Sequence, residues 1–218
     1  MALRPEWWLN FPGRAALVNR NDGSIRAGLC TDELLESELD RFDIHILNLV
    51  QNFICPRLTS VMKMVSYLGS FEVLSLVLAL SLIILFSKKK YAEGITLITA
   101  IAGSYLLTEL LKHTFHRERP DLNILISQTG YSYPSGHSMV SFACYGMLVY
   151  LFFSLTNSKL LRFFVLIFFS IIVGSIGISR IYLGVHYPSD VISGYSAGGV
   201  WLIICLMGLR LIKNKMEL

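Results

Sequence analysis

The chain has 218 residues, of which 54% are hydrophobic and 16% are charged, and its mean hydropathy is +0.57. An apolar share above the roughly 45 to 50% of soluble domains excludes an ordinary soluble protein and indicates an integral membrane protein. The net charge of +4, from 19 Lys+Arg against 15 Asp+Glu, is too small and too scattered for a nucleic-acid-binding surface.

Residues 1–43 contain no apolar stretch long enough to cross a bilayer and no apolar region of a signal peptide. We therefore expect an N-terminal tail over residues 1–43 and a membrane domain over residues 44–218. Between Phe42 and Leu68, apolar residues recur at helical spacing on both sides of Pro56. Because the piece before Pro56 is too short to cross, this pattern predicts two short amphipathic helices on the membrane surface.

Five apolar segments follow and predict an all-α bundle of five transmembrane helices, since each is close to the ~20 residues that a bilayer requires. They cover residues 71–87, 94–111, 139–155, 161–179 and 191–212. Eight basic residues fall on one side of them: Lys88, Lys89, Lys90, Lys159, Arg162, Arg210, Lys213 and Lys215. The positive-inside rule makes that side cytoplasmic. Because the number of spans is odd, residues 1–70 are expected on the other, extracytoplasmic side.

Two further patterns concern packing and thiols. Gly194 and Gly198 form a GxxxG pair, which we interpret as close helix packing. The four cysteines have no spacing typical of a metal site, and we interpret them as inert small hydrophobic residues. They are Cys30, Cys55, Cys144 and Cys205.

The first of three polar segments at the outer ends of the spans contains Lys112 and Arg119, followed by Pro120. A spacing of seven residues predicts that both cations project from one face of a helix that Pro120 ends. Two neighbouring cations favour an anionic ligand, although the pair alone also fits side chains that extend to lipid headgroups. We interpret the residues between them as loop residues that tune substrate choice: His113, His116, Arg117 and Glu118.

The second polar segment is Pro134-Ser135-Gly136-His137, directly before the span that starts near Met139. The main-chain N–H groups of a helix N-terminus bind anions, and glycine permits a close approach. The segment therefore predicts an anion site that contains a histidine. A simple turn that caps a helix is the alternative.

The third polar segment contains Ser179 and Arg180, then His186, and then Asp190 in the first turn of a helix that Pro188 starts. A carboxylate four residues from His186 can fix the imidazole tautomer, which makes the other ring nitrogen a better nucleophile or base. The helix dipole also favours the charged form of Asp190. An interfacial histidine–aspartate hydrogen bond without a catalytic role is the alternative.

Together the three segments resemble the signature of the type 2 phosphatidic acid phosphatase superfamily. The match covers eleven positions: Lys112, Arg119, Pro120, Pro134, Ser135, Gly136, His137, Ser179, Arg180, His186 and Asp190. The resemblance extends over roughly residues 42–212 and implies a helical membrane enzyme. Membrane members of this family usually have six spans, whereas five are predicted here.

The resemblance implies a role for each matched polar residue. His186 would attack phosphorus and form a phosphohistidine, Asp190 would orient it, and His137 would protonate the departing lipid oxygen. The phosphate oxygens would be held by Lys112, Arg119, Ser135, the Gly136 N–H and Arg180, which supply the charge stabilisation that dominates phosphoryl transfer. We expect no metal and no cofactor, because these segments lack the carboxylate ligands of a magnesium site.

The expected activity is therefore the removal of phosphate from a lipid phosphate or diphosphate in the bilayer. Phosphatidic acid, phosphatidylglycerol phosphate and undecaprenyl diphosphate are all candidate substrates. Vanadium haloperoxidases have a related pocket, but they are soluble and lack such spans. A non-catalytic protein that binds or transports an anionic lipid is the alternative from another class, and it would not need both His137 and His186.

Overall fold

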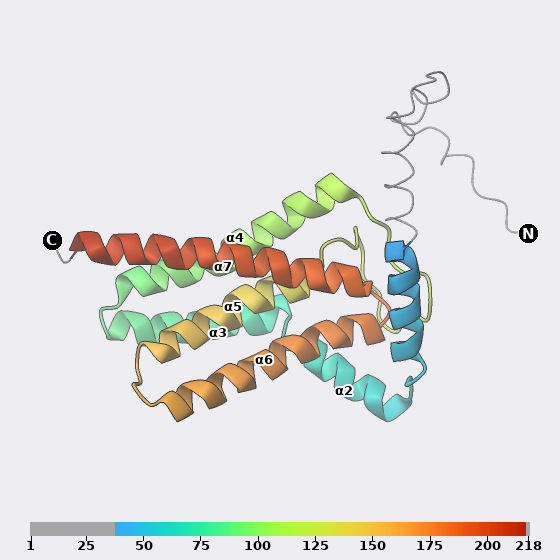
Figure 1. The fold of residues 1–218 in the computed structure, drawn as a ribbon, viewed down its shortest axis with the longest axis horizontal. Coiled ribbons are helices and arrows are strands. Elements are labelled where there is room, and N and C mark those ends of the chain that lie inside the picture. The colour runs from blue at the N-terminus through green and yellow to red at the C-terminus, as the bar shows by residue number, and fades with distance from the viewer. Residues whose placement is uncertain (1–37, 217–218) are drawn as a thin grey trace, which may run out of the picture. The chain divides into compact units, whose positions relative to one another are not determined.

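The protein is described here by a computed structural model, which places residues 38–216 and contains no strand within that range (Figure 1). Residues 38–51 are helical, and six further helices follow: α2 (Pro56–Tyr67), α3 (Phe71–Ser87), α4 (Tyr91–Phe115), α5 (Gly136–Phe153), α6 (Lys159–Tyr182) and α7 (Pro188–Met216). The predicted all-α architecture is confirmed. The predicted tail, residues 1–43, lies almost entirely outside the described residues, and its boundary stays a prediction.

Short polar residues start the helices at the expected points. Ser70, Ser135 and Ser158 are the N-caps of α3, α5 and α6, and each side chain accepts a hydrogen bond from a main-chain N–H of the first turn. Pro56 occupies the first turn of α2, where its missing N–H costs nothing. Local sequence therefore determines where most of these helices begin.

Among residues 38–216, four helices are long and apolar enough to cross a membrane: α4, α5, α6 and α7. The 17-residue α3 meets the same test together with α2, to which it is joined at a bend of 43°. The five predicted spans thus correspond to four single helices and one bent pair. The sequence did not indicate that α2 would pair with α3 in this way.

Large apolar side chains cover the exposed face of α6, including Phe163, Phe164, Phe168 and Ile171. Such a surface suits lipid rather than water, and the chain is a multi-pass membrane protein.

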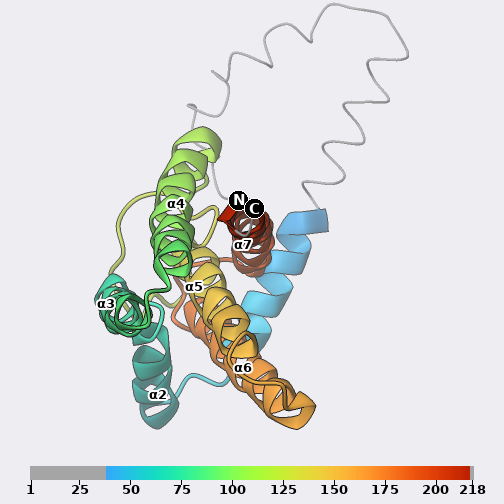
Figure 2. The same cartoon turned by 90° about the vertical axis from the view of Figure 1, so that its left-hand side faces the viewer.

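Helix α5 lies at the centre of the bundle, packed against α4, α6 and α7. Figure 2 looks along the bundle and shows α5 between these neighbours. The expected glycine pair lies at its contact with α7. A Cβ on Gly194 would lie 2.7 Å from the carbonyl oxygen of Ser135, and one on Gly198 would lie 2.5 Å from that of Met139. Only glycine therefore permits this close approach, which brings the second and third turns of α7 against the beginning of α5.

The ends of α4 and α6 and the beginnings of α5 and α7 meet at one end of the bundle (Figure 1). Residues 42–51 lie across this end, where Leu47 is fully buried against Ile181 and Val191. The hydroxyl of Tyr182 accepts a hydrogen bond of 3.1 Å from the main-chain N–H of Cys55. All three polar segments found in the sequence are consequently brought to this end.

Candidate active site

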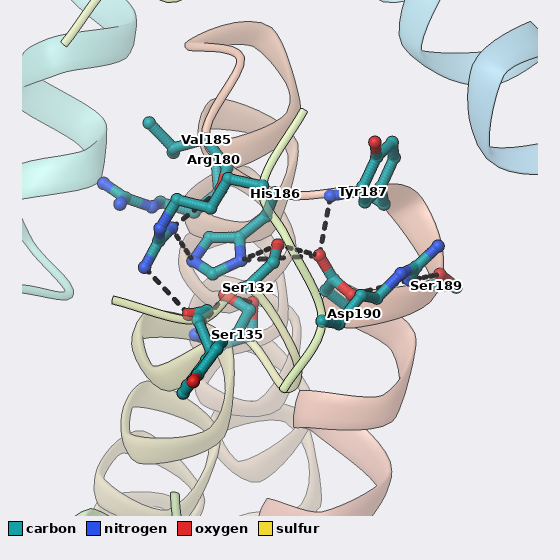
Figure 3. A network of polar contacts seen from close by, with 12 residues as sticks. Ser132, Ser135, Arg180, Val185, His186, Tyr187, Ser189 and Asp190 are labelled. Carbon is teal, nitrogen blue, oxygen red and sulfur yellow. Dashed lines mark hydrogen bonds and ion pairs between the residues drawn. The ribbon is translucent and has the colours of Figure 1, made fainter. Parts of the chain in front are cut away.

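His186 lies in the loop between α6 and α7 and is buried, with 1% of its surface exposed. Its Nδ1 is 3.6 Å from Oδ2 of Asp190 and 3.4 Å from the hydroxyl of Ser132. Figure 3 shows the imidazole facing both side chains. The distance to Asp190 exceeds that of an ordinary hydrogen bond, so the two residues interact as a close pair that Ser132 bridges.

The other ring nitrogen, Nε2, lies 3.4 Å from Nη1 of Arg119. A guanidinium only donates hydrogen bonds, so a contact with it requires an unprotonated Nε2. The carboxylate of Asp190 accepts hydrogen bonds, which favours the proton on Nδ1 of His186. Both neighbours thus favour the same tautomer, in which the lone pair of Nε2 points away from Asp190.

Asp190 is fully buried in the first turn of α7 and accepts three further hydrogen bonds. Its Oδ2 accepts from the hydroxyl of Ser132 at 2.5 Å and from the main-chain N–H of Tyr187 at 2.8 Å. Its Oδ1 accepts from Nη1 of Arg117 at 2.8 Å. These bonds fix the orientation of the carboxylate, and Oδ2 is the oxygen that faces His186.

The prediction that Lys112 and Arg119 share one helix face was wrong, because α4 ends too early. His116 has a φ of 49°, the left-handed conformation that closes a helix. The carbonyl of Arg117 then accepts a hydrogen bond of 2.7 Å from the N–H of Ser132, further along the same loop. Only Lys112 is on α4, in its last turn, and Arg119 lies in the loop beyond it.

Arg119 organises this loop through its guanidinium. It donates to four main-chain carbonyls: Gly130 at 2.9 Å, Thr129 at 3.2 Å, Tyr131 at 3.0 Å and Val185 at 2.8 Å. Val185 directly precedes His186, so Arg119 fixes the main chain on both sides of the site. Burial lowers the pKa of Arg119, whereas the charge of Asp190 opposes that shift.

Arg180 is the most deeply buried cation of the site, with 2% of its surface exposed in the last turn of α6. Its Nη1 donates to the hydroxyl of Ser66 at 2.7 Å, and its Nη2 donates to the side-chain oxygen of Gln128. The third donor, Nε–H, is buried and has no hydrogen-bond partner within residues 38–216. A buried charged donor without a partner is costly and fits an anionic ligand.

The first turn of α5 brings Ser135, Gly136 and His137 beside this cation. Gly136 and His137 line a pocket of about 170 Å³ together with Lys112 and Gln128. The N–H groups in the first turn of a helix have no partner inside the helix, so this turn can bind anions. The hydroxyl of Ser135 accepts from Ser138 at 3.0 Å, which leaves its own hydrogen available to a ligand.

Lys112 lines the same pocket and forms an ion pair of 2.9 Å with Glu109, one turn earlier on α4. The remaining matched positions are buried without a polar group in the pocket. Pro120 and Pro134 lie in the loop, and the hydroxyl of Ser179 donates to a carbonyl of its own helix. The sequence-predicted residues are therefore brought together at one end of the bundle. Lys112 and His137 line the pocket, whereas His186 is buried and is not one of its lining residues.

The charge state of His186 follows from its surroundings. Burial lowers the pKa of His186 to about 4; the charge of Asp190 opposes this shift, and the cations Arg180 and Arg119 reinforce it. The imidazole is therefore neutral at neutral pH. A neutral histidine with its Nε2 lone pair beside Arg119 can act as a nucleophile towards an anionic phosphorus centre.

The comparisons with known proteins identify the family. The model of the PAP2 superfamily matches residues 93–211, which is more than half of the chain. This chain belongs to the PAP2 superfamily. Phosphatidylglycerophosphatase B of Bacillus subtilis (strain 168) is 34% identical over 150 residues, which cover 66% of this PAP2 chain and 71% of that relative. The Undecaprenyl-diphosphatase of Sulfolobus acidocaldarius is 30% identical over 167 residues, or 74% of this chain and 75% of that protein.

Two solved PAP2 structures share the fold. The crystal structure of a transmembrane PAP2 type phosphatidylglycerolphosphate phosphatase from Bacillus subtilis matches with a TM-score of 0.72 and 25% identity over 89% of both chains. Aquifex aeolicus LpxE matches with a TM-score of 0.62 and 30% identity over 76% of this chain and 94% of that one. The predicted family and the predicted enzyme class are confirmed, and this protein is a lipid phosphatase of the PAP2 type.

Proposed function

We propose that this PAP2 phosphatase hydrolyses a phosphate monoester or diphosphate of a membrane lipid through a phosphohistidine at His186. The observation that carries the proposal is the orientation of this imidazole. Its Nδ1 faces Asp190 and Ser132, and its Nε2 faces Arg119. The nucleophilic lone pair is therefore on the side of the cations that would hold the phosphate group.

In the first step, Nε2 of His186 attacks phosphorus, and the bond between phosphorus and the lipid oxygen breaks as the N–P bond forms. His137 donates a proton to the departing lipid oxygen. The proton on Nδ1 stays with the imidazole, and the carboxylate of Asp190 stabilises the positive charge that develops there. The products are the dephosphorylated lipid and the phosphohistidine.

In the second step, a water molecule attacks the phosphohistidine and His137 accepts a proton from that water. The N–P bond breaks, and inorganic phosphate leaves. His137 thus acts as acid and then as base, which restores the starting state of the site after each turnover.

Five groups are proposed to bind the phosphate. They are Lys112, Arg119, Ser135, the Gly136 N–H and Arg180. The unpartnered Nε–H of Arg180 supports this assignment, because an equatorial phosphate oxygen would supply the missing acceptor. Three fixed cations and a helix N-terminus stabilise the charge of the transferring phosphoryl group, so the proposed mechanism uses no metal.

The proposed substrates belong to the same class as the lipids after which the two relatives are named. A phosphatidylglycerophosphatase and an undecaprenyl-diphosphatase act on different lipids, which share a terminal phosphate on a membrane-anchored chain. We include phosphatidic acid in the same class. We also propose that the site faces the extracytoplasmic side of the cell membrane, because the eight basic residues lie at the other ends of the spans.

The deciding experiment uses the full-length protein in detergent and a panel of lipid phosphates. His186→Ala should lose phosphate release by at least about a thousandfold, since it removes the proposed nucleophile. The matched control is His45→Ala, which removes an exposed histidine from residues 42–51. Alkaline quenching with a radiolabelled substrate should trap labelled wild-type protein and no labelled His186→Ala.

Two results would contradict the proposal. Near-normal turnover by His186→Ala would exclude His186 as the nucleophile. Lipid binding without phosphate release by the wild-type protein would favour the alternative, a protein that binds or transports an anionic lipid.

A further inference from the structure

The side chain of Arg117 lies between two buried carboxylates. Its Nη1 donates to Oδ1 of Asp190 at 2.8 Å, and its Nη2 donates to Oδ2 of Asp43 at 2.6 Å. Both aspartates are fully buried, with 0% of their surface exposed. The ring of Tyr187 lies under the guanidinium, 4.4 Å from its carbon. Buried charges persist only when they are paired and hydrogen-bonded, and this arrangement satisfies that requirement for all three groups.

Asp43 also binds the N-terminus of α7. Its Oδ1 accepts from the N–H of Ser189 at 2.9 Å, and its Oδ2 accepts from the hydroxyl of Ser189 at 2.5 Å. The same hydroxyl accepts from Nη1 of Arg117 at 2.6 Å. Ser189 directly precedes Asp190, so Asp43 and Arg117 hold the turn of α7 on which Asp190 lies.

The charges in this group determine how strongly Asp190 acts on His186. The carboxylates of Asp190 and Asp43 raise the pKa of Arg117 and outweigh its burial, so the guanidinium stays charged. Arg117 alone would neutralise Asp190. Because Asp43 shares the same guanidinium, the group of three carries one net negative charge. That charge lies beside Nδ1 of His186, where it would stabilise the positive charge that develops on the ring as Nε2 attacks phosphorus.

We propose that Asp43 and Arg117 are positioning residues of the catalytic centre, which hold Oδ2 of Asp190 towards His186 and preserve its negative charge. This inference rests on the proposed role of His186 as nucleophile. Arg117 lies within the first sequence segment but is none of the eleven matched positions. Asp43 comes from a helix 74 residues earlier in the chain than Arg117.

A purely structural role would predict a different outcome from a positioning role. If Asp43, Arg117 and Asp190 only joined residues 42–51 to α7, a substitution of Asp43 or Arg117 would lower the amount of folded enzyme. The pH profile of the remaining enzyme would stay unchanged. A positioning role changes the electrostatics at His186. The charged groups that face His186 are Asp190, Arg180 and Arg119, and His137 lies near the same cations. A substitution at residue 43 or 117 leaves all four of these side chains in the protein, so a shift of the pH profile would report a change in their surroundings.

The test measures kcat and KM against pH for Asp43→Asn and Arg117→Gln with one lipid phosphate. Asp43→Asn removes a negative charge, so the acid limb of kcat/KM should move to lower pH by about 0.5 unit. Arg117→Gln removes a positive charge, so the same limb should move to higher pH by a similar amount. In both variants kcat should fall by about 10- to 100-fold, because a small misplacement of Asp190 disturbs the attack. KM should change by less than about twofold, since neither residue is one of the proposed phosphate-binding groups.

Three further variants complete the experiment. Arg117→Lys keeps the charge and should restore the position of the acid limb but only part of kcat. The double variant Asp43→Asn/Arg117→Gln should lose less activity than the two single losses multiplied, because both act through Asp190. Asp121→Asn is the matched control, since it removes an exposed carboxylate from the loop that follows α4.

The outcomes separate this inference from the proposed function. Suppose that His186→Ala is inactive but the acid limb of kcat/KM stays at the wild-type pH in both Asp43→Asn and Arg117→Gln. That result would overturn only the positioning role. Shifts in the same direction would overturn it as well. Active His186→Ala would instead overturn the phosphohistidine mechanism on which the inference depends.

Discussion

Ser66, near the end of α2, accepts a hydrogen bond of 2.7 Å from Nη1 of Arg180, near the end of α6. This contact joins two helices that are 114 residues apart in the chain and fixes one arm of the guanidinium. Ser66 is buried, with 5% of its surface exposed, so the end of α2 lies at the site. The helix before the first full span thus takes part in the organisation of the phosphate-binding groups.

Ser66→Ala should weaken phosphate binding, because it leaves a second donor of the buried Arg180 without a partner. Such a loss costs about 1 to 3 kcal/mol, which corresponds to a roughly 5- to 150-fold rise in KM and in the inhibition constant of a phosphate analogue. Ser60→Ala is the matched control, since Ser60 is exposed on the same helix and donates only to a carbonyl of its own turn. An unchanged KM in Ser66→Ala would show that Arg180 keeps its orientation without this bond.

The helices were predictable because their signal is local. Long apolar runs and capping serines fix the positions of α3, α5 and α6, and Pro188 fixes the start of α7. The eleven matched positions were readable for the same reason, since each segment lies within a few residues of a helix end. Their common location at one end of the bundle then follows from the alternating directions of the spans.

The connections within the site were not predictable, because they depend on residues far apart in sequence. Arg119 was expected on a helix, yet four carbonyls of loop residues bind it. Ser132 and Asp43 belong to no recognisable motif, and only the folded chain brings them to Asp190 and Arg117. A polar side chain in a loop carries no local signal that it will be buried beside a charge.

The pH dependence of His186 follows from its lowered pKa. Imidazole attacks phosphorus only in its neutral form, so activity should persist above the folded pKa and be lost as the pH falls through about 4. The unfolded value is about 6.5, so burial of the neutral ring costs stability only below that pH, and the loss is complete near the folded value. A histidine-labelled NMR titration should show one signal, absent in His186→Ala, with a midpoint near pH 4. A midpoint near the unfolded value would mean that water or an anion reaches the ring.

The orientation in the membrane can be tested with a thiol reagent that does not cross bilayers. The loop between α4 and α5 offers two positions for the label. Asn123 is the poorer one, because a cysteine there would remove its hydrogen bond of 3.2 Å to Gln51 at a residue whose φ is 42°. Ser127 is exposed in the same loop and differs from cysteine by one atom. In a background that lacks Cys30 and Cys55, Ser127→Cys should react in intact cells.

The matched control for orientation is Asn157→Cys, in the exposed loop between α5 and α6. It should react only after permeabilisation, since Lys159 and Arg162 mark that side as cytoplasmic. The reverse pattern at the two positions would place the phosphatase site in the cytoplasm and direct it to a different lipid pool.

Vanadate and chelators distinguish a cradle of protein cations from a metal site. Lys112, Arg119 and Arg180 are proposed to stabilise the transferring phosphoryl group, so activity should survive EDTA. Vanadate adopts a five-coordinate geometry like that of the transition state and should therefore inhibit competitively. Arg180→Lys should weaken both turnover and vanadate inhibition by a similar factor, because a single ammonium cannot replace the three donor positions of the guanidinium. Loss of activity in EDTA with recovery in magnesium would contradict stabilisation by these three side chains. Vanadate insensitivity in a protein that still binds lipid would contradict it as well.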